Sequence, residues 1–233
     1  MVTQEMNAAF IFDMDGVLTD NMELHALSWM ALFRDRGLEG LDPQRYLVEA
    51  AGMKGHDVLR RFLDPDIGRE EAEHLTELKD FLYRVNSREL IKPVPGLRAF
   101  LEGAGKAGIG LGVGTGAGPR NTDYVLDLLK VKRLFRAIVD SSQVEAGKPA
   151  PDIFLKAAGL LGVAPSRCLV FEDALQGVEA AVNAGMACVA LTTTNSRETF
   201  GRYPNVIAVI DHFADLDPLH LLERLDAYSA AIS

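Results

Sequence analysis

The sequence is poor in cysteine and in positive charge. Only two cysteines, Cys168 and Cys188, occur among the 233 residues. Each lies inside a short apolar run, which favours buried thiols over a disulfide or redox pair. Lysine and arginine together number 24 against 33 aspartates and glutamates, for a formal net charge of -9. This balance argues against nucleic acid or an acidic membrane as a partner, because a basic surface supplies most of the affinity for both.

Long apolar runs are also missing. No segment approaches the roughly 18 apolar residues of a membrane span, and residues 1–6 contain no basic stretch ahead of an apolar one. We therefore expect a cytoplasmic protein, monomeric or weakly dimeric, that acts on small molecules. Its 48% hydrophobic content suffices for one large domain, or for a domain with a smaller insert.

Short apolar runs alternate with helical patterns from about residue 93 onward. Together with one run near the N-terminus they predict strands at residues 8–12, 110–115, 137–140, 168–171, 188–191 and 206–210. Such runs are typical of strands that are buried on both faces of a parallel sheet. We therefore expect an α/β fold whose core is a Rossmann-like doubly wound parallel sheet.

Residues 21 to about 90 follow a different pattern. No strand-like run of four or more residues interrupts their charged, amphipathic helical pattern. Pro93, Pro95 and Gly96 then disfavour a continuing helix and return the chain to the α/β part. The sequence thus predicts a core of residues 1–20 and 93–233 with a helical insert at residues 21–92.

Two aspartates directly follow the first predicted strand. Asp13 and Asp15 are spaced by two residues, so an extended chain points both side chains the same way. They also lie where the ends of α/β strands open onto a ligand-binding crevice. Gly16 permits the sharp departure of the chain that follows. For this motif alone, an Asp-rich turn with solvated carboxylates is the competing interpretation.

A second acidic pair, Glu172 and Asp173, follows the predicted strand at 168–171. Carboxylates within about 4 Å of one another repel by several kcal/mol at the effective dielectric of a protein surface, so such a cluster needs a cation or raised pKa values. Oxygen ligands of this kind suit Mg²⁺, which also pairs with phosphate oxygens. We therefore expect Mg²⁺ as the cofactor.

Two further positions suit an anion. Lys148 opens a segment whose two prolines fix the loop ahead of a predicted helix. Thr115 ends a predicted strand, and the glycine-rich residues after it, Gly116 to Gly118, offer unhindered backbone N–H groups. Taken singly, these features also fit a solvated lysine and a plain turn. Their combination with two acidic pairs favours a phosphate site.

The order of these motifs resembles a known family. Asp13-x-Asp-Gly-Val-x-x-Asp20, Thr115, Lys148-Pro-x-Pro-Asp-x-Phe154 and Glu172-Asp173 are similar to the four motifs of the haloacid dehalogenase superfamily. The β-phosphoglucomutase-like subfamily is a closer match, on Glu23, His25, Trp29 and the segment 171–181. The resemblance covers nearly the whole chain. It implies a magnesium-dependent phosphotransferase with a helical cap inserted after the first motif.

The resemblance also implies roles for the catalytic residues. Asp13 would be the nucleophile that takes the phosphoryl group. Asp15 would be the general acid and base, which calls for a raised pKa. Thr115 and Lys148 would hold the transferring phosphoryl oxygens. The implied metal ligands are Asp13, the backbone carbonyl of Asp15, and Asp173, with Glu172 close by.

Substrate recognition is expected mainly from the cap. The implied substrate-binding residues are His25, Gly52, Lys54, Lys79, Gly116 and Ala117. The loop 52–57 aligns with the cap loop that meets substrate, but Gly55 stands where the mutases have an arginine. A mutase must bind a phosphate at both ends of its intermediate, and Lys54 replaces a bidentate guanidinium only in part. This departure argues against a mutase.

The sequence therefore predicts a phosphatase that hydrolyses small phosphate monoesters, chiefly sugar phosphates, through an aspartyl-phosphate. One alternative is a β-phosphoglucomutase-like isomerase. A second is a catalytically idle binding or regulatory protein, against which the complete set of motif residues argues. A third is a nicotinamide-binding protein, because Gly112-x-Gly114-x-x-Ala117 follows a predicted strand. That interpretation leaves both acidic pairs unexplained.

Overall fold

The computed structural model describes residues 7–38 and 42–232. Residues 1–6, on which the expectation about the N-terminal segment rests, lie outside this range. Among the described residues, no helix combines the length and the apolar character that crossing a membrane requires. Both cysteines are buried and unpaired, as their apolar surroundings predict.

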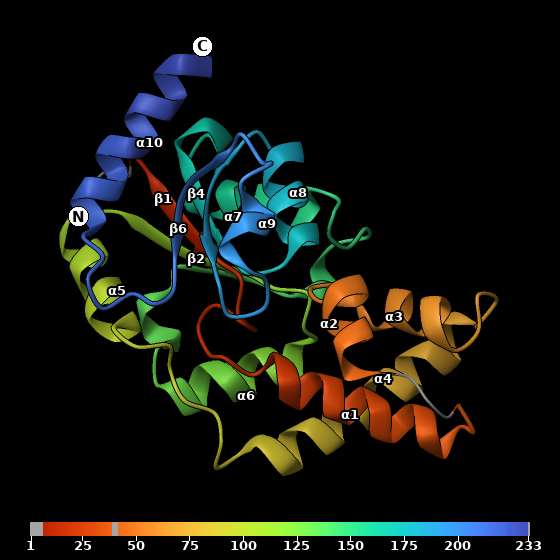
Figure 1. Ribbon diagram of the computed structural model, residues 1–233. Coiled ribbons are helices and arrows are strands. Elements are labelled where there is room, and N and C mark those ends of the chain that lie inside the picture. Colours follow the sequence, from red (N-terminus) through yellow and green to blue (C-terminus); the bar gives the residue numbers. More distant parts are fainter. Residues whose placement is uncertain (1–6, 39–41, 233) are drawn as a thin grey trace.

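One sheet of parallel strands forms the centre of the described chain (Figure 1). Its order is β3-β2-β1-β4-β5-β6, and each neighbouring pair runs parallel. The strands are β1 (Ala9–Phe12), β2 (Gly110–Gly114), β3 (Ala137–Val139), β4 (Cys168–Glu172), β5 (Ala187–Leu191) and β6 (Val206–Ile210). The four central strands are fully buried, which accounts for their unbroken apolar sequences. This arrangement confirms the predicted doubly wound α/β fold.

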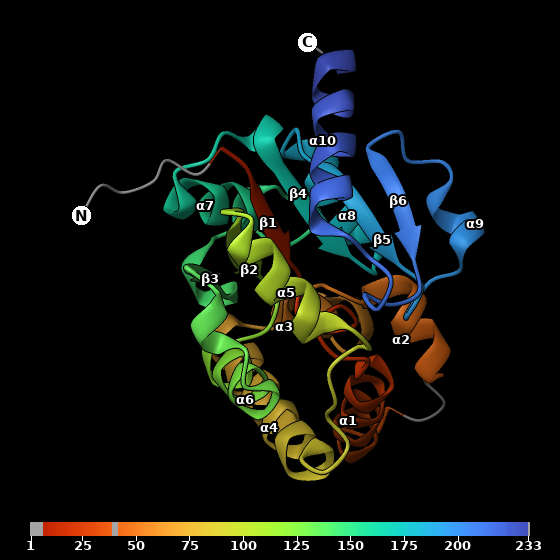
Figure 2. The same cartoon turned by 90° about the vertical axis from the view of Figure 1, so that its left-hand side faces the viewer.

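Helices cover both faces of the sheet (Figures 1 and 2). Side chains of β1 alternate between two cores: Phe10 and Phe12 join one, and Ala9 and Ile11 join the other. Helices α5 (Leu97–Lys106), α6 (Pro119–Leu129) and α10 (Pro218–Ile232) close the first core. Helices α7 (Asp152–Leu161), α8 (Leu175–Asn183) and α9 (Arg197–Phe200) close the second. Short 3-10 turns lie at Lys132–Leu134, Ser141–Gln143 and Pro165–Arg167.

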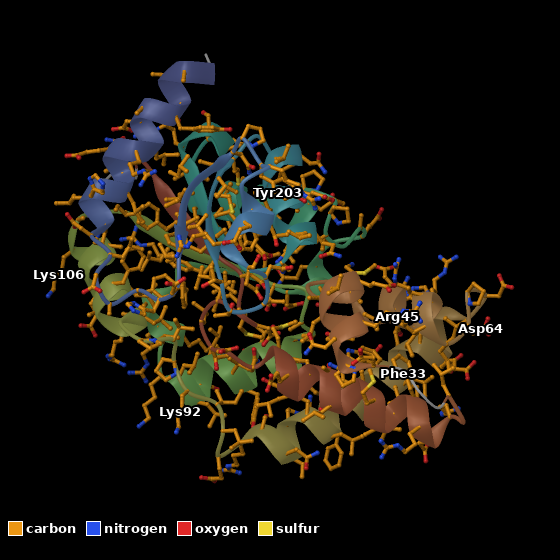
Figure 3. All side chains as sticks on the ribbon, in the orientation of Figure 1. Phe33, Arg45, Asp64, Lys92, Lys106 and Tyr203 are labelled. Carbon is orange, nitrogen blue, oxygen red and sulfur yellow. The ribbon has the colours of Figure 1, made fainter. Side chains whose placement is uncertain are left out.

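A third core lies outside the sheet, among helices α1 to α4. These are α1 (Met22–Asp35), α2 (Pro43–Ala50), α3 (Gly55–Phe62) and α4 (Arg69–Ser87). Their apolar side chains, Trp29 and Phe33 among them, pack mainly against one another. Figure 3 shows Phe33 between these helices, and Figures 1 and 2 show the group beyond the ends of the strands. None of the described residues from 22 to 87 belongs to a strand.

Two chain passages join this helical group to the sheet. They run side by side, because Val94 N donates to Leu18 O at 3.0 Å and Thr19 bridges Pro93. The first passage begins at Asp13, directly after β1. The helices therefore lie next to the edge of the sheet at which the acidic motifs stand.

Candidate active site

The acidic motifs come together where the strand order reverses. Asp13 follows β1, Glu172 ends β4 and Asp173 follows it, and β1 pairs directly with β4. Carboxylate oxygens of these three residues lie within 4.8 Å of one another, and all three side chains are buried. We call Asp13, Glu172 and Asp173 the acid cluster. The reversal of strand order in a doubly wound sheet is the usual place for a ligand crevice.

Lys148 partly balances the acid cluster. Its Nζ donates to Glu172 Oε1 at 2.6 Å and lies 2.9 Å from Asp13 Oδ1. The other Glu172 oxygen, Oε2, accepts the backbone N–H groups of residues 173 and 174, both at 2.8 Å. Gly177 of α8 leaves room for this carboxylate, since a Cβ there would lie 1.7 Å from Oε1. Glu172 thus holds the Lys148 ammonium in place beside Asp13.

One ammonium does not neutralise three carboxylates. Burial raises the pKa of Asp13 to about 7; Lys148 opposes this rise, and Glu172 and Asp15 add to it. Burial, together with Glu172 and Asp13, also raises the pKa of Asp173 well above its usual range. An oxygen-rich site with surplus negative charge fits a hard divalent cation such as Mg²⁺.

Asp15 has different partners. Asn21 Nδ2 donates to its Oδ1 at 2.6 Å, and His25 Nε2 lies 3.3 Å from the same oxygen. Burial alone would raise the pKa of Asp15, but His25 and Asn21 outweigh burial and hold this pKa below its usual range. The motif predicts a raised pKa for Asp15, and the structure corrects this expectation. The reason is that both partners come from α1 and its N-cap, which the motif itself does not reveal.

His25 connects Asp15 to helix α4. Its ring stacks on Tyr83 with the centroids 3.9 Å apart, and its Nδ1 lies 3.2 Å from Lys79 Nζ. Lys79 is buried and pairs with Asp80 Oδ1 at 2.6 Å. A continuous line of polar contacts therefore runs from α4 through His25 to Asp15.

A pocket opens between the acid cluster and the helical group. Eight of the residues expected from the sequence line it: Asp13, Asp15, His25, Gly52, Lys79, Thr115, Gly116 and Ala117. Thr115 is buried, and its Oγ1 accepts the Ala117 N–H at 3.1 Å. Gly116 meets the helical group directly, since a Cβ there would lie 2.7 Å from Gly52 O. The absence of a side chain at Gly116 therefore lets the two loops approach each other.

Lys54 is not brought to the pocket. Its Nζ donates to the backbone oxygens of Val144 and Glu145, at 2.6 and 2.9 Å. Gly147 makes room for the lysine stem, because a Cβ there would lie 2.8 Å from Lys54 Cγ. Lys54 therefore ties the loop before α3 to the sheet side of the molecule.

Several residues of the site were not found by the sequence analysis. Asn21 stands just before α1, a usual N-cap position, which is a signal for a local hydrogen-bonding role. Thr194 donates to Asp173 Oδ2, and three successive threonines after β5 are a polar signal at a strand end. Asp80 and Asn121 line the pocket from α4 and α6 without any local sequence signal.

Two acidic pairs lie where the strand order of the doubly wound sheet reverses, beside a buried lysine and a pocket. This combination is typical of α/β enzymes that bind a cation together with an anionic ligand. Comparison with known proteins narrows this class. The model of the haloacid dehalogenase-like hydrolase family matches residues 8–185. The chain belongs to the haloacid dehalogenase superfamily and, within it, to the β-phosphoglucomutase-like subfamily.

Individual relatives include both mutases and phosphatases. The β-phosphoglucomutase of Mycobacterium tuberculosis is 34% identical over 93% of this chain and 91% of that protein. Hexitol phosphatase A of Escherichia coli is 32% identical over 78% of this chain and 82% of that protein. A crystal structure of β-phosphoglucomutase from Clostridium difficile has a TM-score of 0.82 at 26% identity, and covers 97% of this chain and 100% of that one. The protein is thus similar to enzymes of the phosphatase and phosphoglucomutase types.

Proposed function

We propose that the protein is a magnesium-dependent phosphatase that hydrolyses small phosphate monoesters, chiefly sugar phosphates, through an aspartyl-phosphate on Asp13. One observation carries this proposal. Asp13 and Lys148 are buried side by side within the acid cluster, and Asp13 lines the same pocket as Asp15. One place in the structure therefore holds the proposed nucleophile Asp13, the phosphate-binding ammonium of Lys148 and the proton-transferring carboxyl of Asp15.

The reaction has two steps. A carboxylate oxygen of Asp13 attacks phosphorus, the ester P–O bond breaks, and Asp15 gives its proton to the leaving oxygen. Water then attacks the aspartyl-phosphate, Asp15 takes a proton from it, and inorganic phosphate leaves. Thr115 Oγ1, Lys148 Nζ and the backbone N–H groups after Thr115 would hold the phosphoryl oxygens.

The lowered pKa of Asp15 suits the second step, in which Asp15 acts as a base. The first step needs a protonated Asp15. An incoming phosphate brings negative charge close to this carboxyl, which raises its pKa. Mg²⁺ held by Asp13, Asp173 and Glu172, with the carbonyl of Asp15, would neutralise charge on the transferring group.

The loop 52–57 supports hydrolysis over isomerisation. A Cβ at Gly55 would lie 2.4 Å from Thr76 Cγ2, so an arginine side chain does not fit there without a shift of Thr76 or of the loop. Lys54 is bound to backbone oxygens instead of the pocket. The β-phosphoglucomutase-like isomerase remains the second candidate, because a relative with that name is 34% identical.

The proposal is tested by phosphate release from a panel of sugar phosphates, nucleotides, phosphonates and pyrophosphate, with and without Mg²⁺. We expect Mg²⁺-dependent release from sugar phosphates. Asp13→Asn should lower this release on the order of a thousandfold or more, and Asp35→Asn on the exposed side of α1 should leave it unchanged. Turnover that survives Asp13→Asn would refute the mechanism.

A second assay separates the two candidates. β-Glucose 1-phosphate is supplied with a bisphosphate primer, and both glucose 6-phosphate and free phosphate are measured. Release of phosphate alone supports the phosphatase. Formation of glucose 6-phosphate as the main product would establish the isomerase instead.

A further inference from the structure

The charges that line the pocket are unevenly distributed. Beyond the acid cluster, its far end is formed by α4 and α6, which contribute Thr76, Lys79, Asp80 and Asn121. Lys79 is the one lysine or arginine among the described residues that line the pocket. Its charge is already paired with Asp80 Oδ1 at 2.6 Å. The far end therefore offers no uncompensated positive charge.

Nearby cations have other partners. Arg84 donates to Glu77 at 2.8 Å and to Asn121 Oδ1 at 2.7 Å, and Arg120 donates to Glu77 at 2.7 Å. Neither arginine lines the pocket. Lys148 lies at the opposite end, between Glu172 and Asp13. A second phosphate at the far end would therefore find no free cation, because Asp80 already neutralises Lys79.

The same end has neutral polar atoms without partners. Asn121 is 1% exposed, and its Nδ2 has no hydrogen-bond partner. Because Arg84 occupies Oδ1, the amide group is oriented and Nδ2 is the atom that remains for a ligand. Thr76 Oγ1 is likewise buried without a partner. Buried polar groups are normally satisfied, so two such atoms in one pocket point to hydrogen bonds that a ligand supplies.

We propose that Thr76, Asp80 and Asn121 bind the hydroxyl groups of an uncharged leaving group, and that Asp80 makes the enzyme select phosphate monoesters over bisphosphates. Nδ2 of Asn121 donates to a hydroxyl oxygen, whereas the Asp80 carboxylate accepts from a hydroxyl group. A polyol or sugar that carries one phosphate satisfies all three side chains. The inference rests on the proposed phosphatase function and specifies its substrate class.

The test compares a polyol monophosphate with the bisphosphate of the same carbon skeleton, at saturating Mg²⁺. For the wild-type protein we expect kcat/KM for the monophosphate to be on the order of 100-fold higher, since the second phosphate would lose its hydration at an end of the pocket that offers no free cation. Asp80→Asn keeps the shape, removes the negative charge and leaves the Lys79 ammonium free to bind the second phosphate. It should raise the bisphosphate-to-monophosphate ratio of kcat/KM about tenfold. Asp127→Asn, on the exposed side of α6, is the matched control and should leave the ratio unchanged.

A second variant tests the hydroxyl contacts. Asn121→Ala should raise KM for the polyol phosphate about five- to tenfold more than KM for phenyl phosphate, whose leaving group has no additional hydroxyl. Equal changes in both KM values would overturn the role of Asn121. A wild-type enzyme that hydrolyses the bisphosphate as well as the monophosphate, or an unchanged ratio in Asp80→Asn, would overturn selection by Asp80 and leave the phosphatase function intact. Failure to hydrolyse either ester would overturn the phosphatase function and this inference together.

Discussion

Asp13 shows how a functional residue can weaken the fold that holds it. Its carboxylate is buried with those of Glu172 and Asp173, and the Lys148 ammonium balances one of these three charges. Burial therefore raises the pKa of Asp13 to about 7. In the unfolded chain the same carboxyl has its ordinary pKa near 3.8. Between these two values the folded protein binds a proton that the unfolded chain has already lost.

This difference fixes the sign of a pH dependence. Stability falls with rising pH wherever the folded state binds more protons, so the metal-free protein should lose stability from about pH 4 to about pH 7. Asp13→Asn removes the charge and keeps the shape. At pH 8 without Mg²⁺ it should raise the free energy of unfolding by about 1–3 kcal/mol. Urea unfolding from pH 5 to pH 8 in the presence of a chelator measures both effects.

Asp35→Asn serves as the control for this measurement, because Asp35 is exposed on α1. It should change neither the stability at pH 8 nor its slope with pH. A metal-free Asp13→Asn protein that is less stable than the wild type at pH 8 would show that the Asp13 charge is well compensated. The argument for a cation site at the acid cluster would then fail.

Some residues of the site can be predicted from local sequence motifs, and others come to the site only through the packing of segments that are distant in the sequence. Asp13, Asp15, Thr115 and Asp173 belong to strand-end motifs, and local sequence predicts where parallel strands end. Lys148 opens the proline-containing loop ahead of α7, which is also a local signal. Asp80 and Asn121 line the pocket only because α4 and α6 pack side by side, a contact between segments about forty residues apart. The pKa of Asp15 escaped prediction for the same reason, since it depends on the orientation of α1. The positions of Asp80 and Asn121 and the pKa of Asp15 therefore depend on tertiary packing, which residue type alone does not reveal.

At the scale of elements, composition predicted most of the fold. The six predicted strands correspond to β1 to β6 within one residue at each end. All six are apolar runs, and the four central strands are buried on both faces. The order of strands in the sheet was not predicted strand by strand, since it depends on long-range pairing. The sequence also gave no sign that Lys54 would contact the segment 144–145, about ninety residues away.

Lys54 joins two elements that the chain does not connect directly. Removing its two hydrogen bonds should loosen the loop before α3 from the sheet side. Lys54→Met keeps the aliphatic stem and removes the ammonium, and the loss should be about 1 kcal/mol, or about fivefold in local opening. We expect amide hydrogen exchange in residues 52–57 to become faster by about that factor.

Lys106→Met is the matched control, because Lys106 is exposed on α5, away from the helical group (Figure 3). Its amide exchange in residues 52–57 should equal that of the wild type. Slower exchange in Lys54→Met, or exchange that increases equally throughout α1 to α4, would contradict a local tie at Lys54. The second outcome would instead indicate that the whole helical group had been destabilised.

At the scale of the whole molecule, the pocket lies between the sheet and the helical group. Two cores flank the sheet and the third lies among α1 to α4. The pocket is lined from both sides, by Asp13 and Thr115 of the sheet edge and by Trp29 and Lys79 of the helical group. A ligand that contacts both the sheet edge and the helical group should therefore raise the free energy of unfolding of the whole protein.

A planar phosphoryl mimic such as tetrafluoroaluminate provides this test. In the presence of Mg²⁺, the mimic at about 100 times its own dissociation constant should stabilise the protein by about 2.7 kcal/mol. This raises Tm by about 5–10 °C for a chain of this size. The mimic without Mg²⁺ should have little effect, because the acid cluster then repels it. Lys148→Met should abolish the shift, since this lysine would hold the mimic beside Asp13, whereas Lys106→Met should retain it. A Tm that the mimic does not change under any condition would favour the catalytically idle binding or regulatory protein. The reason is that a protein that does not stabilise the transferring phosphoryl group has no means of accelerating its transfer.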